Sequence, residues 1–136
     1  AVTGQNKKLN KELHNLFGHN ENIHIYSYTS QIPRLMAASD ILISKPGGLT
    51  TSEALSQGLP MIIYQPIPGQ EERNARFLMS KGVALKAQNA DDLTDTCSKL
   101  LGNISGLKEL SEKCLQIAKP NAAQIAAEII YNLAKY

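Results

Sequence analysis

The chain has 136 residues, enough for one domain with a proper core and too few for two. A formal net charge of +2 is too small for a protein that binds the phosphate backbone of nucleic acids. An aromatic content of 5% without tryptophan also argues against a stacking surface for single strands. No apolar run approaches the roughly 20 residues that a membrane-spanning helix needs.

Short β-branched runs alternate with amphipathic stretches, a pattern typical of βαβ units and a parallel sheet. The expected strands are 1–3, 23–26, 41–43, 61–64 and 83–85. The expected helices between them end at Gly18 and cover 32–39, 49–57 and 71–81, and the chain beyond 85 is wholly helical. Without repeats or linkers, the sequence predicts one α/β domain over 1–136. Because a chain seldom begins in the last residues of a strand, we expect another domain before Ala1.

The cysteines and histidines carry no metal-site spacing. Cys97 and Cys114 fall inside helical patterns and are expected to be small buried side chains, in keeping with a reducing, cytosolic location. His14, His19 and His24 are expected to be ordinary surface or core residues.

Three lysines decorate one face of the first expected helix: Lys7, Lys8 and Lys11. A lysine face of this kind is usually solvated, and it also suits an anionic membrane surface. The sequence alone leaves both interpretations open.

The least ordinary residues follow the expected strands, in loops 4–6, 27–31, 44–53 and 65–74. Ligands of open α/β sheets collect beyond the carboxyl ends of the strands, where loops lead into helix N-termini. These loops are therefore the candidate binding region.

The loop 44–53 combines two glycines with a helix start. Gly47 and Gly48 let the backbone approach a ligand, and the helix offers free N–H groups and the positive end of its dipole. Backbone amides of Gly48, Leu49 and Thr50 are candidate diphosphate contacts, and Glu53 is a candidate for ribose hydroxyls. Alternatively, Thr50 and Glu53 form a capping box that needs no ligand. The loop is neither a P-loop nor a G-x-G-x-x-G fingerprint.

The loop 65–74 places Gln70, Glu71 and Asn74 within one turn of a helix start. Their amide and carboxylate groups suit the hydroxyls of a sugar. The alternative is a solvated helix N-terminus, where acids interact favourably with the dipole.

Together these loops resemble the donor-binding domain of the diacylglycerol glycosyltransferases. That family contains plant monogalactosyldiacylglycerol synthases and bacterial processive diacylglycerol glucosyltransferases. More distantly, the chain is similar to the peptidoglycan N-acetylglucosaminyltransferase that makes lipid II. The resemblance rests on K-P-G-G-L-T-x-S-E-A followed by P-x-P-G-Q-E-x-x-N-A, both present between residues 44 and 84.

The resemblance implies the C-terminal half of a GT-B glycosyltransferase, a Rossmann-like parallel sheet with flanking helices. It implies UDP-glucose or UDP-galactose as donor substrate, no further cofactor and no metal. The general base belongs to the N-terminal half, so no catalytic residue is assigned here. A diacylglycerol or glycolipid acceptor, held by that other half, implies a cytoplasmic enzyme peripheral to the membrane.

The same resemblance assigns roles to individual residues. The uracil pocket is lined by Tyr28, Thr29 and Ile32, and Gly4 lies in the cleft. The diphosphate is bound by Gly48, Leu49 and Thr50, and the ribose is bound by Glu53. The hexose or its phosphate is contacted by Gln70, Glu71 and Asn74.

Three alternatives remain at this point. One is a GT-B transferase with another acceptor, such as a peptidoglycan lipid precursor. A second is a UDP-N-acetylglucosamine epimerase-like domain, which the P-G-Q-E motif argues against. The third is a non-catalytic nucleotide-binding α/β module, which the presence of Glu53, Gln70 and Glu71 argues against.

Overall fold

The computed structural model describes residues 1–135, and the chain divides into two compact units, Ala1–Leu35 and Met36–Tyr136. That residues 1–136 act as one domain stays a prediction.

The first unit contains helix α1 (Lys7–Phe17) and the start of helix α2 (Ile32–Ala37). Asn6 caps α1, because its side-chain oxygen accepts a hydrogen bond of 3.0 Å from the Leu9 amide. The predicted strands 1–3 and 23–26 are reduced to one isolated parallel bridge between Val2 and Tyr26. Both side chains are more than a third exposed, so little packing extends the pairing.

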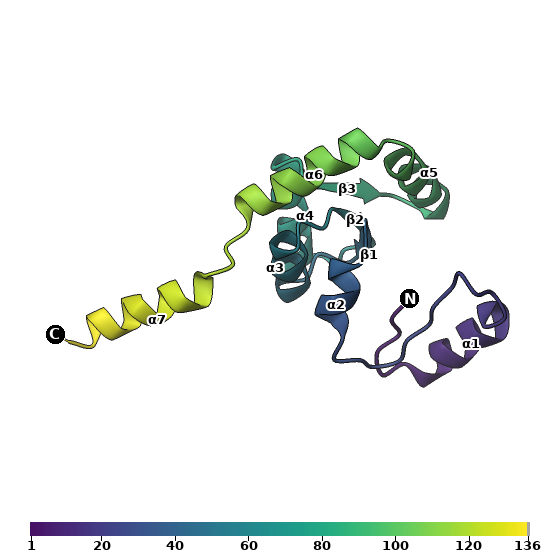
Figure 1. Cartoon of the computed structure of the whole chain (residues 1–136), viewed down its shortest axis with the longest axis horizontal. Coiled ribbons are helices and arrows are strands. Elements are labelled where there is room, and N and C mark those ends of the chain that lie inside the picture. The colour runs from purple at the N-terminus through teal and green to yellow at the C-terminus, as the bar shows by residue number, and fades with distance from the viewer. Residues whose placement is uncertain (136) are drawn as a thin grey trace. The chain divides into compact units, whose positions relative to one another are not determined.

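The second unit holds a parallel sheet with strands β1 (Leu42–Ser44), β2 (Met61–Tyr64) and β3 (Ala84–Ala87) in the order β1-β2-β3. Helix α3 (Gly48–Ser56) connects β1 to β2, and α4 (Gln70–Ser80) connects β2 to β3. Figure 1 traces this alternation along the chain. The predicted parallel α/β sheet is confirmed.

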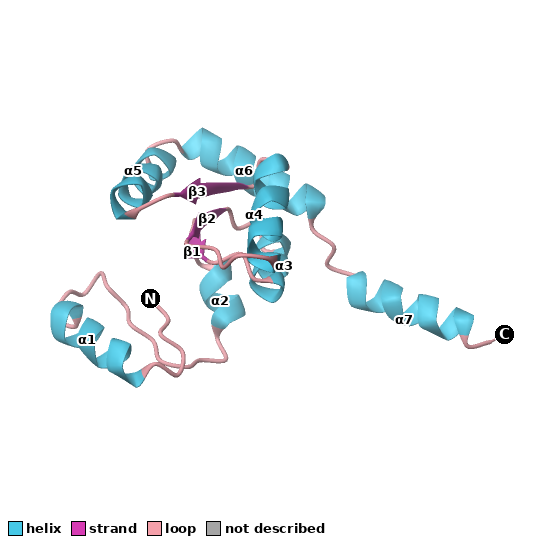
Figure 2. Cartoon of the chain, turned by 180° about the vertical axis from the view of Figure 1, so that it is seen from behind, coloured by secondary structure: helices cyan, strands magenta, loops and turns pink. Residues whose placement is uncertain are grey.

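Three helices follow the sheet: α5 (Ala90–Leu101), α6 (Ile104–Ile117) and α7 (Ala122–Leu133). Helix α5 packs against β2 and β3, and α6 packs against α3 and α5. All side chains of α7 are exposed, and in Figures 1 and 2 no described element of this unit lies against it. Among the described residues, no helix is both long and apolar enough to cross a bilayer.

The core of the second unit is built around the central strand β2. Met61, Ile62 and Ile63 are all buried, as expected for a parallel strand covered on both faces.

The two cysteines differ in their burial. Cys114 of α6 is fully buried, and its thiol donates to the carbonyl of Val83, the residue before β3, across 3.8 Å. Burial raises the pKa of the Cys114 thiol to about 11. Cys97 is only half-buried, so the prediction of a buried side chain is confirmed for Cys114 alone.

Candidate functional site

Two loops leave neighbouring strands at the same edge of the sheet. Ser44, the last residue of β1, pairs in register with Ile63 of β2. The loop 45–47 then leads into α3, and the loop 65–69 leads into α4. Because parallel strands point their carboxyl ends the same way, both loops and both helix N-termini gather at one edge.

A hydrogen bond ties helix α4 to the loop that precedes α3. The side-chain amide of Asn74, in α4, donates to the Pro46 carbonyl at 2.9 Å. Pro46 is fully buried, so this carbonyl has little access to water. Asn74 was predicted to contact the sugar or its phosphate. In the structure its amide nitrogen holds the loop that leads into α3.

The N-terminus of α3 is open. The helix begins at Gly48, its cap residue is Gly47, and no described side chain caps it. The capping-box alternative is therefore wrong, because Thr50 lies inside the first turn and Glu53 lies further along the helix. Among the described residues, the backbone N–H groups of Gly48, Leu49 and Thr50 have no acceptor. These are the amides that the sequence assigned to a diphosphate, and the free N–H groups of a helix N-terminus suit such an anion.

Neither glycine at this helix start is required by the fold. Gly47 has an ordinary φ of −64°, and Gly48 lies outside the left-handed region. An added Cβ at Gly48 would meet no atom within 4 Å, and one at Gly47 would meet only the Thr50 hydroxyl at 4.0 Å. Backbone conformation and internal packing would both accept alanine. Neither the backbone conformation nor the packing explains why these two residues lack side chains. Their absence leaves the backbone at the start of α3 open to the close approach of a ligand.

The side chains along α3 differ in their exposure to solvent and in their hydrogen bonding. Leu49 is 83% exposed, and Glu53 is exposed with no described partner. The hydroxyl of Ser52 donates to the Gly48 carbonyl at 3.0 Å. The Thr51 hydroxyl oxygen is buried without a hydrogen-bond partner among the described residues. Sequence reasoning did not single out Thr51, because three consecutive hydroxyl residues give no sign of which one turns inward.

In the second loop, Glu71 also has a structural partner. Its carboxylate accepts a hydrogen bond of 2.7 Å from the Ile67 amide and so closes the turn before α4. Gly69 makes that turn at a φ of +103°, while Gln70 is exposed. Gln65 has a φ of +47°, a left-handed conformation that is rare outside glycine and asparagine. No sequence signal marks Gln65, and it was not among the predicted site residues.

The remaining predicted residues belong to the first unit. Gly4 turns the chain after residues 1–3 with a φ of +58°. Tyr28 is 74% exposed. The Thr29 hydroxyl accepts a hydrogen bond of 3.1 Å from the Gln31 amide, just before α2 begins at the half-buried Ile32. Their role in holding uracil stays a prediction.

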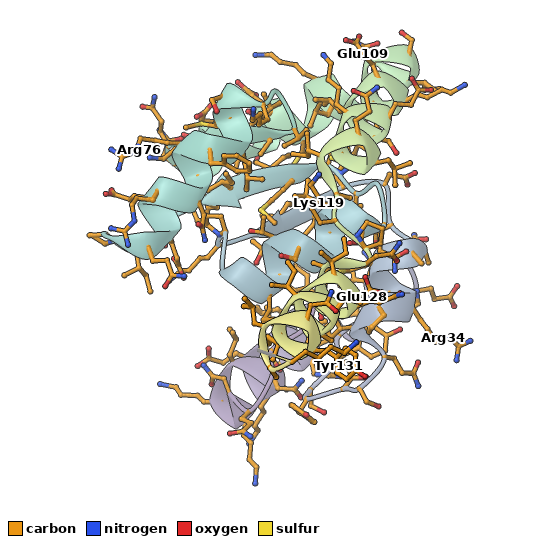
Figure 3. The ribbon with its side chains drawn as sticks, turned by 90° about the vertical axis from the view of Figure 1, so that its left-hand side faces the viewer. Arg34, Arg76, Glu109, Lys119, Glu128 and Tyr131 are labelled. Atoms are coloured by element: carbon orange, nitrogen blue, oxygen red, sulfur yellow. The ribbon has the colours of Figure 1, made fainter. Side chains whose placement is uncertain are left out.

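Other features of the described residues lie away from these loops. A hollow of about 530 Å³ runs along β3, lined by Met79, Ala84, Leu85, Lys86 and Gln88, and includes no predicted site residue. Figure 3 shows Arg76 of α4 and Glu109 of α6 pointing outward from the ribbon. Lys113 lowers the pKa of the exposed Glu109 carboxyl through a 2.6 Å hydrogen bond. In the part of the chain described here, no three potential metal-ligating side chains gather.

Comparison with known proteins shows the family to which the chain is similar. The family model described as "Glycosyltransferase family 28 C-terminal domain" matches residues 1–133. The chain is 39% identical over 115 residues to a processive diacylglycerol beta-glucosyltransferase of Staphylococcus epidermidis strain ATCC 12228, covering 85% of this chain and 29% of that protein. A protein of the same name from Bacillus subtilis strain 168 is 30% identical over 131 residues, covering 96% of this chain and 34% of that protein. The chain thus spans about a third of the length of these relatives.

Two solved structures share the fold. MurG of Acinetobacter baumannii superposes with a TM-score of 0.75 at 23% identity, over 93% of this chain and 41% of that one. WaaG, a glycosyltransferase involved in lipopolysaccharide biosynthesis, superposes with a TM-score of 0.69 at 21% identity, over 95% of this chain and 36% of that one. The predicted C-terminal half of a GT-B glycosyltransferase fold is confirmed by these likenesses.

Proposed function

The chain belongs to the glycosyltransferase family 28 C-terminal domain family, and on that premise we propose that it holds the UDP-hexose donor of a two-domain transferase. The observation that carries the proposal is the open N-terminus of α3, with unpaired amides at Gly48, Leu49 and Thr50. A diphosphate there accepts hydrogen bonds from the amides and interacts favourably with the helix dipole.

The surrounding residues support the same arrangement. Glu53 lies on α3 with a free carboxylate, whose two oxygens suit hydrogen bonds donated by two neighbouring ribose hydroxyls. Gln70 is exposed at the start of α4, at the same edge of the sheet, and offers an amide to the hexose. Glu71 and Asn74 serve first to fix the two loops, through Ile67 and Pro46. We therefore assign them a positioning role beside any contact with the donor.

The donor hexose is proposed to be glucose and the acceptor a diacylglycerol or glycolipid. Support comes from the names of the relatives, which are diacylglycerol beta-glucosyltransferases. The likeness to MurG, at 23% identity, concerns the fold alone and does not favour a peptidoglycan precursor as acceptor. An acceptor of this kind would keep the full-length enzyme at the cytoplasmic side of a membrane.

The chemistry assigned to this chain is stabilisation of the leaving UDP. Cleavage of the bond between the sugar and the β-phosphate leaves negative charge on the diphosphate. Backbone donors that already point at that position stabilise the charge without reorganising. The general base is expected from the other half of the enzyme, so this chain supplies donor binding and leaving-group stabilisation.

Calorimetric titration of the chain with UDP, UDP-glucose, ADP and GDP tests the donor role. We expect UDP and UDP-glucose to bind and the two purine nucleotides to bind at least about tenfold more weakly, a difference of about 1.4 kcal/mol. Equal affinities for all the nucleotides, or no binding at all, would overturn the proposal. The isolated chain should transfer no glucose to diacylglycerol, because positioning of donor against acceptor supplies about 7–11 kcal/mol of the barrier reduction.

A further inference from the structure

Gln65 has a backbone conformation that its local sequence disfavours. Its φ is +47°, in the left-handed region where the Cβ of an L-residue crowds the neighbouring carbonyl. The next residue is Pro66, whose ring favours extended backbone at the preceding residue, with a φ of about −120°. Both local rules therefore predict an extended residue 65, and the folded chain holds it in a strained conformation instead.

A turn alone would not require a side chain at this position. The other described residues with a positive φ are all glycines: Gly4, Gly58, Gly69 and Gly82. Glycine adopts this conformation without strain because it has no Cβ. Glutamine at residue 65 therefore costs stability that glycine would not, which points to a role for its side chain.

The side chain of Gln65 contributes little to the fold. It is exposed, and its described hydrogen bond runs from Nε2 to the Tyr64 hydroxyl at 3.4 Å, longer than a well-formed bond of this type. Tyr64 is its neighbour in the chain, so this bond joins no distant elements. The role of the side chain therefore lies outside the packing of the described chain.

The residues on both sides of Gln65 are held in place. Strand β2 pairs with β3 as far as Tyr64. Beyond Gln65, Pro66 and Pro68 have fixed φ angles, and the Ile67 amide donates to the Glu71 carboxylate at 2.7 Å. Local strain persists in a folded protein under this condition, when the surrounding structure fixes the chain on either side.

Gln65 lies at the edge of the sheet where both loops of the proposed donor site begin. It directly follows β2, the central strand, at the carboxyl end where open α/β sheets bind their ligands. The neighbouring strand β1 leads from the same edge to the open start of α3. Gln65 itself begins the loop that leads to Gln70 and α4. The strained residue therefore belongs to the region assigned to the diphosphate and the hexose.

We propose that Gln65 is a specificity-determining residue whose side-chain amide binds hydroxyls of the donor hexose. This inference rests on the proposed function and extends it by one residue. A glutamine amide both donates and accepts hydrogen bonds, as sugar hydroxyls do, and it carries no charge that would favour the diphosphate. A site that hydrogen-bonds a substrate hydroxyl discriminates against ligands that lack it. The strained backbone gives the amide a direction that it would not have in an extended strand.

The test compares Gln65→Gly with Gln65→Ala, and Gln116→Ala on the exposed side of α6 is the control. Both variants of Gln65 remove the amide, but only glycine also removes the strain. Calorimetric titration with UDP and with UDP-glucose gives the ratio of the two affinities. Denaturant unfolding of each chain measures its stability.

We expect both variants of Gln65 to bind UDP within about twofold of the parent chain. The ratio of UDP-glucose affinity to UDP affinity should fall at least about fivefold in both, because the hexose loses a hydrogen-bonding partner. Gln65→Gly should unfold at the same denaturant concentration as the parent chain or at a higher one. The control should keep the ratio of the parent chain.

An unchanged ratio in Gln65→Gly would overturn the inference. A fall in UDP affinity as large as the fall in UDP-glucose affinity would also overturn it, because the contact would then be to the UDP part of the donor. A marked loss of stability in Gln65→Gly would show that the side chain serves the fold. The preference of the parent chain for UDP over ADP judges the donor role separately, and failure there would overturn both proposals.

Discussion

The side-chain amide of Asn74 donates to the Pro46 carbonyl at 2.9 Å and joins helix α4 to the loop before α3, 28 residues earlier in the chain. Pro46 directly precedes the two glycines at the open start of α3. The position of the unpaired amides therefore depends on a residue of α4. Through this bond, the helix whose start would meet the hexose also holds the loop that would meet the diphosphate.

Replacing Asn74 should disturb both stability and ligand binding. Asn74→Ala leaves a buried carbonyl without a partner, which lowers the free energy of unfolding by about 1–3 kcal/mol. Asn74→Asp should cost at least as much, because a carboxylate cannot donate to the carbonyl. Denaturant unfolding and UDP titration measure the two effects. Asn132→Ala, on the exposed α7, is the matched control. Loss of stability with unchanged UDP affinity would contradict the role of Asn74 in positioning the α3 start.

Gly48→Ala separates the needs of the fold from those of the ligand. The added methyl group meets no atom within 4 Å, and alanine is favoured over glycine in a helix by about 0.5–1 kcal/mol. We expect the melting temperature to stay the same or rise. Affinity for UDP should fall at least about tenfold, because the methyl group keeps the diphosphate from the amides. Uridine, which has no phosphates, should bind the parent chain and the Gly48→Ala variant equally. A variant that binds UDP normally would show that the diphosphate lies elsewhere.

Glu53→Gln tests the ribose contact without the complication of a capping role, since the helix cap is Gly47. If the carboxylate accepts from both ribose hydroxyls, two charge-assisted hydrogen bonds of roughly 1.5–3 kcal/mol each are weakened. We expect UDP affinity to fall at least about tenfold with an unchanged melting temperature. Glu112→Gln, an exposed acid of α6, is the control. In addition, 2′,3′-dideoxy-UDP should bind the parent chain much more weakly than UDP, yet show little difference from UDP in the variant.

Cys114 should make stability depend on pH at the alkaline end. Its pKa in the folded chain is raised to about 11 from an ordinary value of 9.0. The folded chain therefore keeps this proton after the unfolded chain has lost it. The stabilisation is fully present below about pH 9 and is lost as the pH rises through about 11. Comparing urea unfolding of the parent chain and Cys114→Ala between these values isolates the contribution of the thiol. An identical pH dependence in both would contradict it.

Reaction with a thiol reagent tests the burial of Cys114 independently of its pKa. At pH 8 the half-buried Cys97 should react with an aromatic disulfide, while the fully buried Cys114 should react only after unfolding. Two rapidly reacting thiols in the folded chain would show that α6 is not packed as described.

Several local features of this protein follow from its sequence alone. The apolar run Met61–Tyr64 predicts a buried parallel strand, and β2 has those bounds. The glycine pair before residues 49–57 predicts a helix start at a strand end, and α3 begins one residue earlier, at Gly48. These predictions succeed because periodicity, glycine and strand length act within a few neighbouring residues.

The partners of polar groups were decided only by the tertiary structure. Thr50 and Glu53 match a capping box in sequence, yet the helix begins at Gly48 and leaves its amides open. Asn74 looks like a sugar-binding residue of α4, yet its amide reaches Pro46 across 28 positions. A hydrogen bond depends on which loops the sheet brings to one edge, and side-chain type cannot specify that. The sequence by itself therefore determined the three parallel strands of the second unit, the helices between them and the candidate loops. Packing decided which of their polar groups remain free for a ligand, and it left the predicted strands 1–3 and 23–26 as a single bridge.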